Sequence, residues 1–435
     1  MRGFLFGLFL AVATAGSVAV QSAVQAKPEK FVVLFNAATA AYNSKDYPAM
    51  EQRLREALAV RPAHPTALYN LASAHALRGD VVGALDTLGA LAKMGLSFDP
   101  AKDSDFASLL ENPGFTGVDT RFARNRDPVG SATPVFRVFT PTFIPEGIAY
   151  DSDTGAYFLG GAHEREIVRI PRASQTAQDF VTPGAGGLWA PLGMQADSPR
   201  RLLWVATAGI PQMRNAEKNE LGRSAVLAYD LDSGLLKRRH VLPEDGAEHL
   251  LGDVEVLRNG TIYTTDSKAG LLYALNSTTG KFTALTLPGQ LASPQGMAIS
   301  KDRKTLYVAD YTQGLFAYDI EKASLTRLDV GEGISVYGID GLYWYENQLV
   351  AVQNGIRPHR VVRFKLDESG RRVLHARVMA ANLPEFDEPT LGVVVGNRFS
   401  FVANSQWNRF DKKNRLPPKD QLRSPVVLRI ALDGD

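Results

Sequence analysis

Two sets of positions beside strand-like segments could bring oxygen-bearing side chains together. The first set precedes a strand and comprises Glu146, Leu192, Gly252 with Asp253, Gln295, Asp340 and Leu391. The second set follows the next strand and comprises Gly161, Thr207, Asp266, Asp310, Gln353 with Asn354, and Asn404. Carboxylate and carboxamide oxygens are the ligands that calcium, magnesium and manganese prefer. If the fold gathers these positions, they predict a cation site; the alternative is that they cap strand ends and bind water.

A repeated phrase, a residue followed by glycine and an apolar residue, gives the reason to expect that gathering. Its copies begin at Glu146-Gly147-Ile148, Leu192-Gly193-Met194, Gly252-Asp253-Val254, Gln295-Gly296-Met297, Asp340-Gly341-Leu342 and Leu391-Gly392-Val393. Intervals of about 40–60 residues with about four strands each are typical of propeller blades. A propeller brings the same corner of every blade to one central mouth. The pattern predicts a mainly β fold, a six-bladed β-propeller over residues 135–435.

Residues 27–125 have a helical period instead. Leu34 aligns with Leu68, and Leu54 with Leu88, at the spacing of about 34 residues that tetratricopeptide repeats have. This spacing predicts a small all-α, tetratricopeptide-like domain before the propeller. Two repeats are fewer than such arrays usually need. The module therefore either offers a groove to a protein partner or serves as a packing unit.

The first 26 residues are typical of a secretory signal peptide. Arg2 precedes an apolar run from Phe4 to Ala15, and small residues at Val24 and Ala26 fit a cleavage site. The chain has no cysteine, which excludes thiol nucleophiles and zinc–thiolate sites. An exported chain without cysteine predicts a periplasmic or secreted protein. No later apolar run is long enough to predict membrane insertion.

The charge balance and several motifs exclude other functions. The formal net charge of +2 gives no electrostatic case for nucleic acid as a partner. The phrase from His163 to Glu166 lacks the spacing of zinc proteases and is assigned to a solvated hairpin, with a ligand contact of His163 near the mouth as the alternative. No Gly-x-Ser-x-Gly elbow occurs. Trp407 either packs within a blade or offers an aromatic contact to a ligand, and we expect residues 411–419 to form an exposed insertion in the last blade.

From about Thr140 to its end, the chain resembles the six-bladed propellers of the gluconolactonase, senescence-marker-protein and luciferin-regenerating-enzyme group. The phrases that carry the resemblance are Pro145-Glu146-Gly147, Ser293-Pro294-Gln295-Gly296 followed by Leu306-Tyr307-Val308-Ala309-Asp310, and Ile339-Asp340-Gly341-Leu342. In that family one divalent metal ion in the mouth is held by a Glu, an Asn and an Asp. Matched by motif, the resemblance implies metal ligands at Glu146, Gln295 and Asp340. Calcium is the expected ion, with magnesium, manganese or zinc as alternatives.

Two positions depart from the family pattern. Gln295 stands where the family has Asn, so an extra methylene moves the amide oxygen. Gly252 stands where the family has an Asn that contacts substrate, whereas the neighbouring Asp253 is retained. The resemblance implies a substrate contact at Asp253. The further candidates for orienting substrate are Asp310, Asn354 and Asn404.

These observations lead to two hypotheses of different classes. The first is a periplasmic, metal-dependent hydrolase of a lactone or related sugar-like ester, in which Asp340 takes a proton from the attacking water. The second is a non-catalytic propeller that binds a ligand or a protein, with the helical module as a partner-docking unit. The retained Glu146, Asp253 and Asp340 favour the hydrolase, whereas Gln295 and Gly252 favour the binding protein.

Overall fold

The computed structural model describes residues 29–174 and 176–433, which form two compact units divided between Asn125 and Arg126. The predicted signal peptide, residues 1–26, lies outside the described residues. Within the described part of the chain, no helix is long and apolar enough to cross a membrane. The two units are described separately below.

The first unit is helical. Its helices are α1 (Lys30–Asn43), α2 (Tyr47–Val60), α3 (Pro65–Leu77), α4 (Val81–Lys93) and α5 (Pro113–Arg124), with short 3₁₀ turns η1 (Pro100–Lys102) and η2 (Ser104–Leu109). Asp46 and Asp80 begin α2 and α4 by accepting the backbone N–H of Ala49 and Gly83. Consecutive helices from α1 to α4 pack on one another. The tetratricopeptide assignment of these helix pairs stays a prediction.

The second unit is a six-bladed β-propeller, as the repeat predicts. Blades 1 to 3 are β2 (Pro145–Tyr150), β3 (Tyr157–Gly161), β4 (Glu166–Ile170), β5 (Gln178–Val181); β6 (Ala190–Asp197), β7 (Leu202–Ala208), β8 (Ser224–Asp230), β9 (Leu236–Val241); and β10 (Leu251–Val256), β11 (Thr261–Asp266), β12 (Leu271–Asn276), β13 (Phe282–Ala284). Blades 4 to 6 are β14 (Pro294–Ile299), β15 (Thr305–Asp310), β16 (Gly314–Asp319), β17 (Ser324–Arg327); β19 (Ile339–Tyr345), β20 (Gln348–Gln353), β21 (Arg360–Leu366), β22 (Arg372–Ala381); and β23 (Gly392–Val395), β24 (Arg398–Val402), β25 (Val426–Ala431), β1 (Thr133–Arg137). A short strand, β18 (Asp329–Val330), adds to β22.

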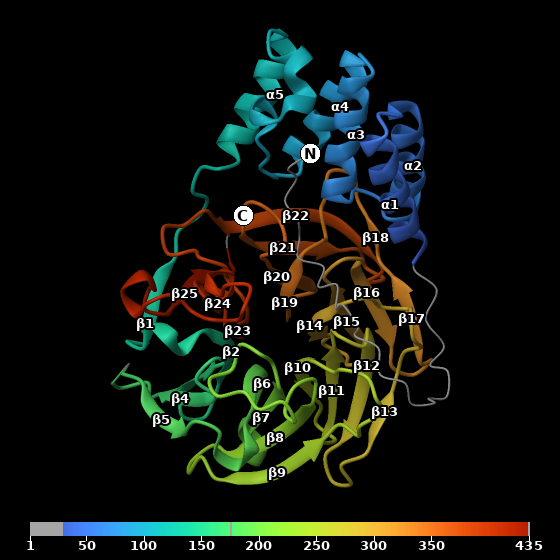
Figure 1. Ribbon diagram of the computed structural model, residues 1–435. Helices are drawn as coiled ribbons and strands as arrows, with labels where there is room; N and C mark the ends of the chain where they lie inside the picture. The colour runs from blue at the N-terminus through green and yellow to red at the C-terminus, as the bar shows by residue number, and fades with distance from the viewer. Residues whose placement is uncertain (1–28, 175, 434–435) are drawn as a thin grey trace. The chain divides into compact units, whose positions relative to one another are not determined.

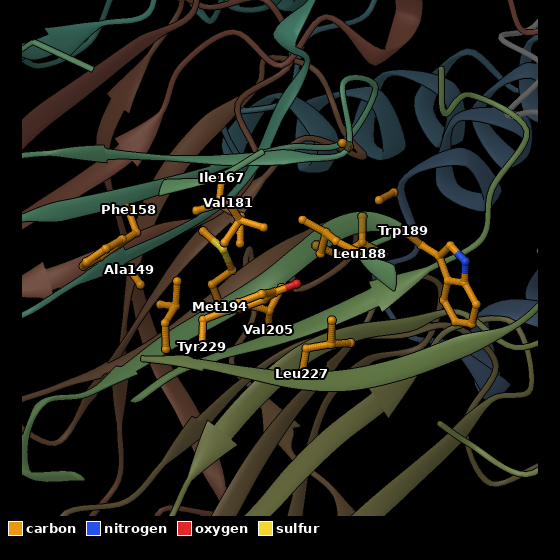
Figure 2. Close-up of a cluster of buried hydrophobic side chains, with 14 of the residues drawn as sticks. Ala149, Phe158, Ile167, Val181, Leu188, Trp189, Met194, Val205, Leu227 and Tyr229 are labelled. Carbon is orange, nitrogen blue, oxygen red and sulfur yellow. The ribbon is translucent and has the colours of Figure 1, made fainter. Parts of the chain in front are cut away.

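The ring of blades is closed by both ends of this unit. The first strand, β1, pairs antiparallel with the last, β25, and so completes blade 6. The innermost strands contact one another in order around the centre, from β2 through β6, β10, β14, β19 and β23 back to β2 (Figure 1). Closure leaves no sheet face without a neighbour, so side chains on both faces of each blade are buried. Figure 2 shows one such core, where Phe158 and Ile167 of blade 1 lie beside Met194 and Val205 of blade 2.

The repeated glycine phrase marks an irregularity in the innermost strands. In blades 1 to 5, the pairing of the innermost strand shifts register at this phrase, for example between Pro145 and Ile148. Such a bulge bends a strand and redirects a side chain. A Cβ atom on Gly147 would lie 1.8 Å from the carbonyl oxygen of Leu192 in the next blade. Glycine is therefore required at position 147, and the residue before it faces the channel mouth; the third copy of the phrase has Asp253 in the place of this glycine.

Candidate functional site

A cavity of about 250 Å³ occupies the mouth of the propeller channel. Its lining residues are Glu146, Leu192, Ile210, Gln212, Leu250, Gly252, Asp253, Gln295, Gly296, Asp340, Leu391 and Trp407. All the residues of the first predicted set are among them. The bulged innermost strands therefore gather the positions that the repeat singled out, from all six blades.

Glu146 begins blade 1 and is held by an aromatic residue of blade 6. The indole Nε1–H of Trp407 donates to Oε2 of Glu146 at 2.5 Å. Burial raises the pKa of Glu146 well above its usual range, and the nearby carboxylate of Asp340 raises it further. Within the described residues, Oε1 of Glu146 has no hydrogen-bond partner. This oxygen is the one that can serve a ligand in the cavity.

Asp340 begins blade 5 and is fixed by a chain of two hydrogen bonds. The Nδ2 group of Asn354 donates to Oδ2 of Asp340 at 2.6 Å, and the hydroxyl of Tyr311 donates to Oδ1 of Asn354 at 3.0 Å. Burial raises the pKa of Asp340 to about 7, with further contributions from Glu388 and Asp253, although the Asn354 bond opposes the shift. A carboxylate with this pKa exchanges protons near neutral pH, as a general base must.

Asp253 also lines the cavity, but its oxygens already have partners. Oδ2 accepts the backbone N–H of Met297 at 2.8 Å, and Oδ1 accepts the N–H of Val254 at 2.9 Å. Burial nevertheless raises the pKa of Asp253 to about 7. Because Met297 belongs to blade 4, Asp253 joins blades 3 and 4. Its negative charge acts on the cavity, while its oxygens are less available to a ligand than those of Glu146.

The two departures from the family pattern, Gln295 and Gly252, lie side by side. A Cβ atom on Gly252 would lie 3.7 Å from Oε1 of Gln295 and 3.5 Å from the hydroxyl of Thr265. The longer side chain of Gln295 thus extends beside the space that a side chain at position 252 would occupy. Nε2 of Gln295 donates to Ser293 at 3.2 Å, which leaves Oε1 as the oxygen toward the cavity. The longer side chain at position 295 and the missing side chain at position 252 therefore affect the same part of the cavity.

The oxygen atoms that face the mouth determine which ions could bind there. Among residues 29–174 and 176–433, no three His, Asp or Glu side chains form a ready-made metal cluster. The mouth instead offers two carboxylates, Glu146 and Asp340, and the carboxamide of Gln295 around one cavity. Hard cations accept such mixed oxygen sets and complete their shells with water. Burial raises both pKa values, and neighbouring carboxylates raise them further: Asp340 acts on Glu146, and Glu388 and Asp253 act on Asp340. A bound cation would relieve this repulsion. By donor chemistry, these residues fit.

Of the second predicted set, only Asn354 reaches the site, through its bond to Asp340. Asp310 and Asn404, predicted to contact substrate, do not line the described cavity. Both are fully buried and bonded to backbone: Asn404 accepts from Val426 and donates to Ser424. Asp266 and Gln353 likewise bind neighbouring residues. Asp266, Asp310, Gln353 and Asn404 thus lie at strand ends and turns, as expected if these polar residues cap the strands.

We therefore expect Asp310→Ala to destabilise the propeller. Oδ2 of Asp310 accepts the N–H of Ala292 and Ser293, and Oδ1 accepts those of Thr312 and Gln313, at 2.6–3.0 Å. Leaving these donors unpaired should lower the free energy of unfolding by about 2–4 kcal/mol. Urea denaturation measures this change, with the exposed Asp329→Ala as control. A loss no larger than in the control would contradict the assigned role.

Sequence reasoning located several residues near the site only in part. For Trp407 it left blade packing and an aromatic contact to a ligand open; the side chain packs against an apolar cluster, lines the cavity and binds Glu146. For His163 it left a solvated hairpin and a ligand contact open; its Nδ1–H donates to the carbonyl of Gln212 at 2.5 Å and its ring lies 5.7 Å from Phe410. Tyr311 was not singled out, although it directly follows Asp310, which ends the second strand of blade 4. For Trp407 and Gln212 no local pattern signals the role, because long loops bring them to the mouth.

The fold and the cavity define this protein as a six-bladed β-propeller with an acidic site at its mouth. Among solved structures, the chain is similar to a luciferin-regenerating enzyme, with 17% identity, coverage of 70% of this chain and 95% of that chain, and a TM-score of 0.46. It is also similar to a gluconolactonase from Xanthomonas campestris, with 16% identity, coverage of 70% and 99%, and a TM-score of 0.46. The chain is also similar to regucalcin, a calcium-binding protein from Agrobacterium tumefaciens, with 15% identity, coverage of 69% of this chain and 95% of that chain, and a TM-score of 0.48.

Structural neighbours thus include members of the group that the sequence resembles. At TM-scores and identities this low, the likeness assigns neither an activity nor a ligand to this chain. No protein-family model and no curated protein sequence matches the chain. The chemistry of the mouth therefore has to be argued from its own residues.

Proposed function

We propose that this protein is a divalent-metal-dependent hydrolase of a lactone or related ester. One observation carries the proposal: the carboxylates of Glu146 and Asp340, each with a raised pKa, share one cavity with the carboxamide of Gln295. Such an arrangement combines a group that can move a proton near neutral pH with oxygen donors for a cation. Glu146, Asp340 and Gln295 would hold the ion, which when bound supplies polarisation of the ester carbonyl and of water.

Asp340 moves the proton in this proposal. Its Oδ2 stays bonded to Asn354, so Oδ1 takes the proton of the attacking water as the new carbon–oxygen bond forms. Asp340 then returns that proton to the ring oxygen as the ring carbon–oxygen bond breaks. Water and lactone are thereby converted to one hydroxy acid, and the enzyme regains its initial state. Tyr311 orients Asn354, and Asn354 in turn keeps Asp340 in place.

The substrate and location are part of the proposal. The polar wall of Gln212, Asp253 and Gln295 suits a small ligand with hydroxyl groups, such as a sugar-like lactone. An all-oxygen donor set supports calcium, with magnesium, manganese or zinc as alternatives. The signal-like segment at residues 1–26 supports a periplasmic or secreted protein. The charge balance gives no support for a nucleic-acid partner.

A second candidate is a non-catalytic propeller that binds a ligand or protein. Asp253 favours it, because both carboxylate oxygens are engaged by the backbone and leave only two carboxylates for a cation. In that case the helical unit would dock a protein partner. The two candidates differ in turnover, since a binding protein retains its ligand unchanged.

The test is lactone hydrolysis with and without metal. Chelator-treated protein is assayed with δ-valerolactone and glucono-δ-lactone by titration of the acid released, before and after calcium, magnesium, manganese or zinc is added. We expect turnover that one or more of these ions restores. Absence of turnover with every ion, in a folded protein that still binds the lactone, would contradict the hydrolase proposal and support the binding protein.

A further inference from the structure

Two connections at the mouth of the propeller are much longer than their equivalents. Between the second and third strands, blades 1, 3, 4 and 5 have connections at residues 162–165, 267–270, 311–313 and 354–359. The same connection spans residues 209–223 in blade 2 and 403–425 in blade 6. We call these the blade 2 loop and the blade 6 loop. Each supplies residues to the cavity: Ile210 and Gln212 from the former, and Trp407 from the latter.

The blade 2 loop is fastened to blade 1. The N–H of Arg214 donates to the carbonyl of His163 at 2.7 Å, and its guanidinium binds Glu164 at 2.5 Å. Glu220 pairs with Arg165 at 2.8 Å. These contacts place the loop across the boundary between blades 1 and 2. Gln212 is thereby held above the cavity by a loop with little freedom to move.

The blade 6 loop is fastened at the other side of the mouth. Asn408 donates its N–H to Glu388 at 2.8 Å, and Arg409 pairs with Asp387 at 2.7 Å. The rings of Trp407 and Phe410 lie 5.9 Å apart, and Trp407 donates to Glu146 of blade 1. This loop therefore reaches from blade 6 onto blade 1.

A side-chain hydrogen bond joins the two loops, and Trp407 of the blade 6 loop also packs against the apolar cluster that contains Ile210 and Met213 of the blade 2 loop. Nε2 of Gln212 donates to Oδ1 of Asn414 at 2.8 Å. His163 contacts both loops, because its Nδ1–H donates to Gln212 and its ring packs on Phe410. Gln212 and Trp407 line the cavity, whereas Asn414 is not among its lining residues. The pair thus joins the two loops at the mouth, with Gln212 at the cavity and Asn414 outside its lining.

We propose that the blade 2 and blade 6 loops form a cover, clasped by Gln212 and Asn414, that limits the size of the ligand. In this proposal Gln212 and Trp407 are the specificity-determining residues. The cavity has a volume of about 250 Å³, below the usual range of about 300–1,000 Å³ for drug-sized ligands, and it is partly open to solvent. We therefore expect single-ring molecules to enter it more readily than fused two-ring molecules. The inference concerns the cavity of the proposed hydrolase, but its first test does not depend on hydrolysis.

The test uses the fluorescence of Trp407 as a reporter of access. The emission of Trp407 is obtained by subtracting the emission spectrum of the same protein carrying Trp407→Phe. Trp189 and Trp204 are buried and are present in both proteins, so the subtraction removes their emission. The metal-free chain is titrated with two neutral quenchers, acrylamide and the bulkier succinimide. In the wild-type protein we expect acrylamide to quench Trp407 several-fold more strongly than succinimide.

Opening the clasp should change the size selection. Asn414→Ala removes the acceptor without altering the lining, and we expect it to raise succinimide quenching of Trp407 about threefold. Gln212→Ala breaks the same bond and also shortens a lining side chain, so it should raise succinimide quenching at least as much. Adding Asn414→Ala to Gln212→Ala should give no further increase, because the bond is already broken. Lys412→Ala, an exposed position in the same loop, is the matched control. Succinimide quenching equal to that of the control in both clasp variants would overturn the proposal.

A second readout separates this proposal from the proposed function. In the presence of the activating ion, Asn414→Ala should gain at least about tenfold in the rate of dihydrocoumarin hydrolysis relative to δ-valerolactone. If neither lactone is hydrolysed by any variant, the hydrolase proposal fails, and the quenching data still decide whether the cover exists. If both lactones are hydrolysed equally by the wild-type protein, the size limit is contradicted.

Discussion

Asp340→Asn is expected to lower kcat for lactone hydrolysis by about 100- to 10,000-fold, the usual contribution of a general base. The amide keeps an oxygen that can accept the Asn354 hydrogen bond, so the geometry of the strand should be retained. It cannot take a proton from water, and it carries no charge toward a cation. Titration of released acid measures the rate, and circular dichroism measures the fold.

The same substitution should stabilise the metal-free protein at pH 8. It removes a buried carboxylate whose pKa is raised to about 7 and which repels Glu146. Asp329→Ala, at an exposed position away from the cavity, is the control for both measurements. A folded Asp340→Asn protein with wild-type turnover would show that Asp340 is not the base.

Metal-free protein should become less stable as the pH rises from 5 to 8, and a bound cation should reverse the loss. Burial raises the folded-state pKa of Asp340 and Asp253 to about 7, and that of Glu255 to about 8. Between the unfolded values near 4 and these folded values, the folded state binds more protons than the unfolded state. The free energy of unfolding therefore falls as pH increases. We expect a total loss of at least about 2 kcal/mol.

Among the other titrating groups, His240 and His359 oppose this direction, because burial lowers the pKa of both, that of His359 to about 3, and the folded protein therefore gains stability as the pH rises toward 6.5. The four carboxylates Asp340, Asp253, Glu255 and Glu166, whose pKa values are raised to about 7 or 8, outweigh these two histidines. The carboxylates of Asp151, Asp230 and Asp411 have pKa values lowered to about 2, so their stabilisation is already complete at pH 5. His249, whose pKa Asp266 and Asp245 raise to about 9, loses stabilisation as the pH rises above 6.5, in the same direction. Urea denaturation at pH 5 and pH 8, with chelator and with calcium, measures the effect. A flat or rising stability in chelator would contradict it.

The sequence alone predicted the gathering of the mouth residues correctly, for a physical reason. Gly147 and Gly296 recur because neighbouring blades approach so closely that a Cβ atom would collide with backbone. The same constraint bulges the strand and directs Glu146 and Gln295 to the cavity. A requirement of backbone packing therefore leaves a signal in the sequence at the positions that line the site.

The rest of the site could not be predicted because it depends on contacts between distant loops. Trp407 reaches Glu146 only because a long loop crosses from blade 6 to blade 1. Asp310 and Asn354 both follow second strands, but a turn takes both oxygens of Asp310, whereas Asn354 is free to bind Asp340. Residue type at a strand end does not distinguish these cases. Only the local hydrogen bonds do.

The structure also changes the interpretation of the two departures from the family pattern, Gln295 and Gly252. In the sequence they are two separate losses from the family pattern. In the structure Oε1 of Gln295 lies beside the space left by Gly252, so the amide oxygen is moved within the cavity rather than removed from it. A cation site with altered geometry is therefore compatible with both residues.

The most direct test of the account is calorimetric titration of the chelator-treated chain with calcium, and then with magnesium, manganese and zinc. Glu146→Ala and Asp340→Ala test the mouth, and Glu255→Gln tests a channel carboxylate outside the mouth cavity. The account predicts one site for at least one ion, lost in both Ala variants and kept in Glu255→Gln. Absence of binding for all four ions, or binding that survives both Ala variants, would contradict a cation site at the mouth.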